Sequence, residues 1–282
     1  MLRHRTSRMI LIGILVTGII AAVLVSVYWK AYVLDLAEKE LRSAFKEYSV
    51  KISSREVTAR SLIFRGIEVA KRGQEVLKTG EFRADFTIVP LITKRAARFS
   101  IKDIVIYEKL KIPEAHGSFV YSKGVIAFGS LSARVLDGTV AGGALIKLGK
   151  VPYYAAALTL NGLKLEKIIE ILDLGEKLDL SGLVDGSIEL SGNGGALTRL
   201  KGRLKTASEG GILTIKDQEW LNAIAVYAKA DIKIIEENFK NYSYNEGNAN
   251  LGLKGTSVVL EAHLNGPAGK RDLVISLHDF NK

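Results

Sequence analysis

The chain has 282 residues, a formal net charge of +10 and no cysteine. The lack of cysteine excludes disulfide bonds, cysteine-based metal sites and thiol catalysis. The positive charge is not gathered into a tract of Lys and Arg interleaved with aromatic residues, so we expect no nucleic-acid partner. With 27 glycines and 4 prolines beside abundant Val, Ile and Leu, the composition is typical of many short strands joined by turns.

An uncharged apolar segment lies near the start of the chain. Residues 9–28 read MILIGILVTGIIAAVLVSVY, and a helix of about 20 such residues spans a bilayer. Arg3, Arg5 and Arg8 precede it and acidic residues follow it, which predicts a cytoplasmic tail over residues 1–8 and an exported remainder. A cleavable signal peptide is the alternative, although its apolar region is usually ~7–15 residues long and no A-x-A-like site follows here.

The exported part is predicted to begin with a helix and to continue as strands. Residues 31–47 have an apolar stripe at helical spacing, which predicts a juxtamembrane helix. Over residues 49–282 apolar and polar residues alternate, which indicates half-buried strands of one extracytoplasmic domain. The apolar residues that we expect to line one face of this sheet are Leu131, Val135, Val184, Ile188, Leu190, Leu200, Leu204, Leu260, Leu273, Ile275 and Leu277.

Two short amphipathic helices are predicted among the strands. The first lies within residues 163–175, where Gly175 is placed to end it. The second follows Asp217, which is expected to cap it. So few helices cannot cover a sheet of about 12–15 antiparallel strands, so the sheet must curl over itself or leave its apolar face open. The expected buried stripe of the second helix is Trp220, Leu221, Ile224 and Ala228.

The order of these features resembles the AsmA-like family of bacterial envelope proteins. Three segments carry the resemblance, residues 50–108, 128–217 and 258–280. The middle one is the strongest: a short helix is followed by a strand with Gly182 and Gly186, a glycine-rich turn at 192–195 and a glycine pair at 210–211. The resemblance implies a transmembrane helix followed by a long, curled antiparallel sheet with an apolar groove. It also implies an architecture related to the chorein-type bridge-like lipid-transfer proteins.

The function implied by the resemblance is lipid handling at the cell envelope. The protein would be anchored in the bacterial inner membrane, with its main domain in the periplasm. It would hold or transfer membrane lipids, phospholipids above all, and contribute to outer-membrane lipid homeostasis. The alternative is a membrane-tethered β scaffold or assembly factor without lipid transport. An envelope protein or a second copy of the chain is the expected protein partner.

No pattern in the chain points to catalysis. The phosphate-binding, metalloprotease and serine-hydrolase motifs are missing from the sequence. The glycines at 192–195 lie between two predicted strands and do not open a helix, so a tight turn is favoured over a phosphate site. His116, His263 and His278 are dispersed, and no metal site is predicted. We therefore expect no enzymatic activity and no cofactor.

Overall fold

The computed structural model describes residues 35, 48–58, 60–85, 97–147, 149, 151–194 and 196–277. The predicted tail over 1–8, the predicted membrane-spanning segment 9–28 and the juxtamembrane helix 31–47, apart from Asp35, lie outside these residues. Among the helices formed by the described residues, none has the length and apolar character needed to cross a membrane.

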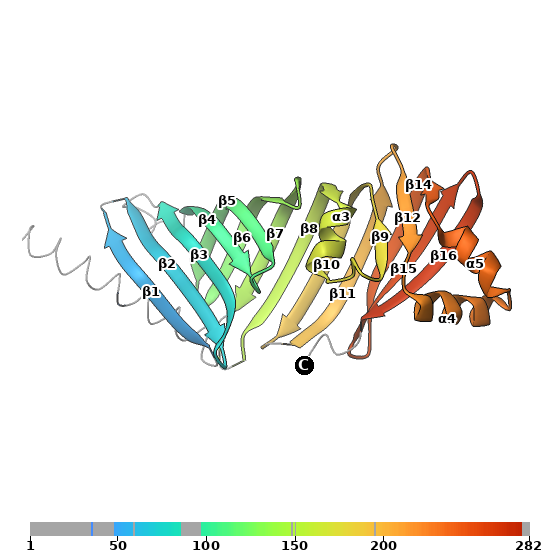
Figure 1. The fold of residues 1–282 in the computed structure, drawn as a ribbon. Helices are drawn as coiled ribbons and strands as arrows, with labels where there is room; N and C mark the ends of the chain where they lie inside the picture. Colours follow the sequence, from blue (N-terminus) through green and yellow to red (C-terminus); the bar gives the residue numbers. More distant parts are fainter. Residues whose placement is uncertain are drawn as a thin grey trace, which may run out of the picture.

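The described chain is mainly β, as the alternating pattern predicts. Thirteen strands form one antiparallel sheet in the order β1-β2-β3-β4-β5-β6-β7-β8-β10-β11-β14-β15-β16. Figure 1 shows it as one long, twisted array with β1 and β16 at opposite ends. The strands are β1 (Ser49–Val57), β2 (Ser61–Lys71), β3 (Gln74–Asp85), β4 (Ala97–Ile106), β5 (Leu110–Ser122), β6 (Val125–Val135), β7 (Gly138–Lys147), β8 (Tyr153–Lys164), β10 (Leu183–Asn193), β11 (Ala196–Thr206), β14 (Glu246–Lys254), β15 (Ser257–Gly266) and β16 (Gly269–Leu277).

Tight turns explain why most neighbouring strands in this sheet are also neighbours in sequence. Positive φ at both central residues is the geometry of type I′ hairpin turns, whose twist matches that of the flanking strands. The pairs Arg72–Gly73 and Lys123–Gly124 have it, and so does Leu136–Asp137, which contains no glycine. The predicted turn at 192–195 contains fewer residues than expected, because β10 continues to Asn193 and β11 begins at Ala196.

Two long connections interrupt the hairpin order, one between β8 and β10 and one between β11 and β14. Together they form a small covering layer, which Figure 1 shows over the half of the sheet that contains β16. Three of its strands pair in the order β13-β12-β9. The layer comprises α3 (Leu165–Ile171), β9 (Leu178–Leu180), β12 (Gly211–Ile215), α4 (Gln218–Ala228), α5 (Ile232–Phe239) and β13 (Tyr242–Tyr244).

The covering layer has the largest apolar core of the described chain. Tyr244 and Leu213 are 1% and 2% exposed, and they pack with residues of β9, α4 and α5. Leu264 of β15 belongs to the same core, and Leu273 of β16 packs against it. The layer is thus held to the main sheet by burial of apolar side chains from both.

Two details of the predicted helices require correction, and a third is confirmed. Gly175 does not end α3; the helix ends at Ile171, and Asp173 takes the left-handed conformation while the Leu174 N–H reaches the Ile169 carbonyl. This is the Schellman pattern, with an aspartate in the place usually held by glycine. Asp217 does cap α4, accepting from the Trp220 N–H at 3.0 Å. The buried residue of its last turns is Ala225, whereas Ala228 is exposed because the chain leaves the core there.

Helix α5 was not expected from the sequence. Asp231 caps it by accepting from the Lys233 N–H at 2.8 Å, and Ile235 and Phe239 are buried on one face. With only eight residues it is stable through this burial and not through its own length.

Candidate functional site: the apolar face of the sheet

One cross-strand row of residues crosses all thirteen strands without a polar side chain. In an antiparallel sheet, residues directly opposite each other lie on the same face, so a chain of such pairs defines a row. The central apolar row is Val57, Leu62, Ala84, Phe99, Gly117, Leu131, Gly142, Leu158, Ile188, Gly202, Leu251, Leu260 and Ile275.

Two further rows extend this face on either side of the central one. The first crosses every strand from β2 to β16 and is equally apolar: Phe64, Phe82, Ile101, Ala115, Ala133, Val140, Leu160, Gly186, Leu204, Ala249, Ala262 and Leu273. The second, from β4 to β11, is Ala97, Phe119, Phe128, Ala144, Ala156, Leu190 and Leu200. We call the three rows the apolar face.

The register places the residues predicted from the sequence together on this face. Eight of them belong to the three rows: Leu131, Ile188, Leu190, Leu200, Leu204, Leu260, Leu273 and Ile275. Val135 and Val184 lie one pleat beyond the rows on the same face, opposite Gly138 and Leu163. Leu277 is described by its backbone, which pairs with Val258. The sequence reasoning missed the contributions of β1, β2, β3, β4, β5, β7, β8 and β14.

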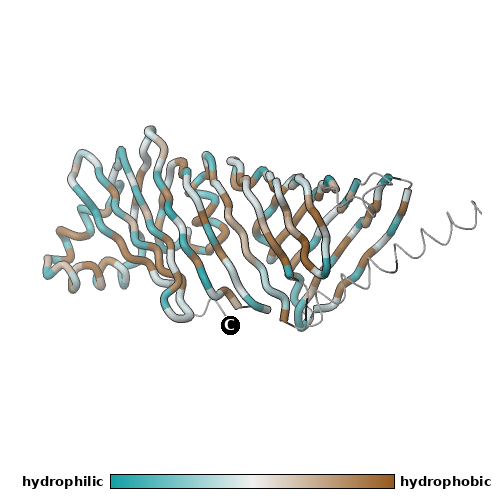
Figure 2. The backbone as a smooth tube through the Cα atoms, turned by 180° about the vertical axis from the view of Figure 1, so that it is seen from behind, coloured by the Kyte–Doolittle hydropathy of each residue, from teal (hydrophilic) through white to brown (hydrophobic). Residues whose placement is uncertain are grey.

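The opposite face of the sheet is mostly polar. The row displaced by one residue from the central apolar row is Glu56, Ile63, Arg83, Ser100, His116, Ser132, Ala141, Thr159, Ser187, Arg203, Asn250, Glu261 and Val274. Figure 2 shows hydrophobic and hydrophilic residues alternating along the strands. Small residues of β7 and β8 on this side line a depression of about 430 Å³, which Glu189 and Arg199 border.

The covering layer shields one part of the apolar face. Helix α3 packs Leu165 and Ile168 against Leu160, Leu163 and Val184, each at most 6% exposed. Farther along the sheet, the core of the layer includes Leu264 and takes up Leu273. These contacts cover parts of β8, β10, β15 and β16.

Another part of the apolar face is not covered by any described segment of the chain. Phe128, Leu131, Ala144, Leu158 and Leu190 are each only partly buried, and none of them belongs to a buried apolar cluster of the described chain. The Phe128 ring stands edge-on to Phe99 with centroids 5.4 Å apart. Over β6, β7 and β8 the sheet therefore presents an apolar strip bordered by aromatic rings.

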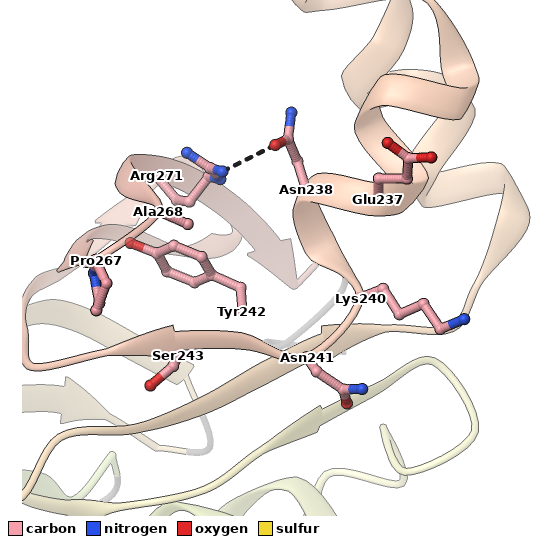
Figure 3. Close-up of a pocket in the computed structure, with 9 residues that line it drawn as sticks. All are labelled: Glu237, Asn238, Lys240, Asn241, Tyr242, Ser243, Pro267, Ala268 and Arg271. Carbon is pink, nitrogen blue, oxygen red and sulfur yellow. Dashed lines mark hydrogen bonds between the residues drawn. The ribbon is translucent and has the colours of Figure 1, made fainter.

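A small pocket of about 210 Å³ lies between α5 and β16, the last strand of the sheet (Figure 3). The Arg271 guanidinium lies over the Tyr242 ring, 4.8 Å from its centroid, and its Nη2 donates to Asn238 Oδ1 at 3.1 Å. The Tyr242 hydroxyl donates to the Gly269 carbonyl at 2.5 Å. Burial raises the pKa of Tyr242, while the positive charge of Arg271 acts in the opposite direction. These contacts join the layer to the edge of the sheet, although the buried Nε of Arg271 has no hydrogen-bond partner among the described residues.

The described residues offer no constellation typical of catalysis or metal binding. Within them, no group of three or more His, Asp or Glu side chains is placed to hold a metal ion. His116 lies on β5, whereas His263 lies on β15 and pairs with Asp272 at 2.7 Å. His278 is outside the described residues. The apolar face is the one extended feature of unusual chemistry in this part of the chain.

No protein-family model, curated protein or solved structure matches this chain.

Proposed function

We propose that the protein holds the acyl chains of membrane lipids against the open part of its apolar face. The central apolar row is the observation that supports this proposal, because it continues across thirteen strands, beyond the part of the sheet that the covering layer shields. Soluble proteins rarely leave large apolar surfaces uncovered unless those surfaces bind something.

The physical gain comes from removing lipid methylene groups from water. Each buried CH₂ contributes about 0.8 kcal/mol, or ~25 cal/mol per Å² of apolar area. The open strip combines Leu131, Leu158 and Leu190 with the small residues Gly142 and Ala144. An acyl chain would lie over the small residues, between the larger side chains. The head group of a lipid would remain in water beside the polar ends of the strands.

The size of the sheet limits what one copy does. Thirteen strands have twelve spacings, which at ~4.8 Å each give a row of roughly 58 Å. One molecule is therefore suited to hold, receive or present lipid near a membrane, and a continuous bridge between two membranes requires a partner or further copies. As part of the same proposal, the chain resembles the AsmA-like family, is anchored in the inner membrane by residues 9–28 and carries its sheet in the periplasm.

A second candidate function is a β scaffold for envelope proteins. In the sheet order, β1 and β16 are the outer strands, each paired on one side within the described chain. Such edges can accept a strand from another protein through main-chain hydrogen bonds. A stable protein partner recovered by crosslinking, without lipid, would favour this function.

A matched pair of substitutions separates the two candidates. Leu158, on the open strip, and Thr159 are adjacent on β8 and lie on opposite faces, apolar and polar. We expect the full chain, gently extracted, to carry phospholipid detectable by mass spectrometry, Leu158→Asp to lose it, and Thr159→Asp to keep it. Thermal unfolding of both variants verifies that they fold. Wild-type protein without bound lipid would refute the proposal.

A further inference from the structure

One edge of the sheet is basic and lacks carboxylates. At this edge β5, β7, β10 and β14 end, and β6, β8, β11 and β15 begin. Lys123 lies in the turn between β5 and β6, Lys147 ends β7 and Lys254 ends β14. The sequence contains no Asp or Glu around these turns, over residues 120–128, 143–157, 191–198 and 252–260. The positive charge of this edge is therefore not compensated locally.

The sheet curls so that its first strands reach the same side of the molecule. Figure 1 shows the start of β1, the turn between β2 and β3, the start of β8 and the turn between β14 and β15 along the lower side. Burial raises the pKa of Tyr154 in β8, and the nearby Tyr48, which precedes β1, raises it further. The start of β1 therefore lies close to the start of β8.

These first strands add positive charge to the edge. Lys71 lies over the Tyr48 ring, 5.3 Å from its centroid, and Arg72 follows in the turn between β2 and β3. Glu75 is the one carboxylate over residues 69–76, and it pairs with Lys78 at 3.9 Å.

The opposite ends of the same strands carry both signs of charge. Asp137 lies in the turn between β6 and β7, Asp185 near the start of β10 and Glu246 at the start of β14. Asp137 accepts from Lys164 Nζ at 2.9 Å. The two edges of the sheet thus differ in charge.

Apolar side chains are exposed between the cations of the basic edge. Val151 is 66% exposed and Tyr153 is 36% exposed. We call this edge the basic rim; its residues are Lys71, Arg72, Lys123, Lys147, Val151, Tyr153 and Lys254. Apart from Lys71, its cations form no ion pair within the described part of the chain.

We propose that the basic rim rests on the anionic head groups of a lipid bilayer. Its cations stand on separate turns along one side of the sheet, which suits an extended anionic surface. A stable protein partner requires a compact patch of about 800 Å² on each side. The exposed Tyr and Val fit the boundary between head groups and acyl chains, and lysines reach the phosphates from their apolar stems.

This contact would bring the open strip to a source of lipid. Ala144 and Ala156 of the apolar face pair with each other three residues from Lys147 and Tyr153, which pair at the rim. A lipid that leaves the bilayer at the rim would meet these small residues first. The inference rests on the proposed function for the identity of the bilayer, which is the one that residues 9–28 would enter.

Because the chain has no cysteine, one introduced cysteine is the single labelling site. A fluorophore is attached to the full chain at Val151→Cys on the rim or at Lys270→Cys, an exposed site at the opposite ends of the strands. The protein is reconstituted in vesicles of phosphatidylcholine with or without phosphatidylglycerol, in which some head groups carry a nitroxide quencher. With phosphatidylglycerol we expect the probe at 151 to be quenched about threefold more strongly than the probe at 270, and with phosphatidylcholine alone the difference should shrink.

Charge reversal tests whether the rim lysines cause the contact. A triple variant of the rim should lose most of the quenching at 151: Lys123→Glu, Lys147→Glu and Lys254→Glu. A matched triple variant reverses exposed lysines at the opposite ends of the strands and should keep the quenching: Lys111→Glu, Lys205→Glu and Lys270→Glu.

Equal quenching at 151 and 270 in the anionic vesicles would overturn the proposal, and so would an equal loss in the two triple variants. Phospholipid that remains bound to the purified protein is measured separately by mass spectrometry. Protein without bound lipid that still shows quenching at 151 would refute lipid holding on the sheet and support the rim contact. Lipid-bearing protein with equal quenching would refute the rim contact alone.

Discussion

The apolar face of the sheet has two regions with similar side chains that differ in how deeply those side chains are buried. Over β15 and β16 its residues enter the core of the covering layer, whereas over β6, β7 and β8 they stay partly exposed. The difference lies in the connections and not in the strands. The two long connections place their residues over the far half of the sheet, whereas the two-residue turns between β5 and β6 and between β6 and β7 are too short to cover the face. Whether an apolar strand residue becomes core is decided by segments distant in sequence.

The sharpest way to test this contrast is to remove one leucine from each region. Leu213 is 2% exposed in the core of the layer, so Leu213→Ala should destabilise the protein by about 3–4 kcal/mol, through lost burial and a residual cavity. Leu158→Ala on the open strip should cost about 1 kcal/mol, because its side chain already contacts water. Urea-induced unfolding of both variants measures the two costs, and equal values would show that the strip is covered.

The second prediction is that the covered region makes the stability of the protein depend on pH, through Tyr244. Burial, with a smaller effect of Glu166, raises the pKa of Tyr244 to about 12, and its hydroxyl donates to the Ser181 carbonyl at 2.6 Å. The phenol is neutral in the folded state and ionises near pH 10 when unfolded, so its contribution is complete below pH 10 and is lost as the pH rises toward 12.

The expected loss between pH 10 and 12 is about 2–3 kcal/mol. Denaturant unfolding at several pH values measures it, and Tyr244→Phe should flatten the dependence. Tyr227→Phe is the matched control, because that side chain is 92% exposed in the folded protein. An unchanged slope in Tyr244→Phe would place the responsible group elsewhere.

Glycines on the two faces of the sheet provide a smaller contrast. A Cβ at Gly117, in the central apolar row, would lie 1.8 Å from the Ser130 carbonyl oxygen and 2.9 Å from the Phe99 ring. Gly117→Ala should therefore cost about 2 kcal/mol. A Cβ at Gly252, on the polar face of β14, meets no atom within 4 Å. Gly252→Ala should be neutral or stabilise by up to about 1 kcal/mol, as measured by thermal unfolding.

The sequence predicts the part of the apolar face in which apolar residues alternate with charged or strongly polar ones. In β11, Leu200 and Leu204 alternate with Lys201, Arg203 and Lys205, so the period of two is visible. In β7 and β8 the polar face carries Ala141, Ala157 and similar small residues, which hides the period. The row through Gly142 and Leu158 is recognisable only once the register is known.

The covering layer was less predictable than the main sheet for a related reason. Its strands β9, β12 and β13 are short. The pair β9 and β12 is separated in sequence by β10 and β11, and the pair β12 and β13 by α4 and α5. Local patterns indicated α3 and α4 but not that they and α5 would lie together over one half of the sheet. Pairings such as Leu213 with Leu180 and Tyr242 depend on the tertiary fold and leave no periodic signal.

The smallest expected effect concerns the cap that starts α4 within the layer. Asp217 accepts from the Trp220 N–H and lies 3.9 Å from Lys177 Nζ, so Asp217→Ala removes the cap and should cost about 1 kcal/mol. Glu219→Ala, in the first turn of the same helix, makes no cap and should cost a few tenths of that. Thermal unfolding measures both. If Asp217→Ala also increases lipid binding on the sheet, the layer controls how much of the apolar face is open; if stability alone changes, the boundary between covered and open regions is fixed by the core around Leu213 and Tyr244.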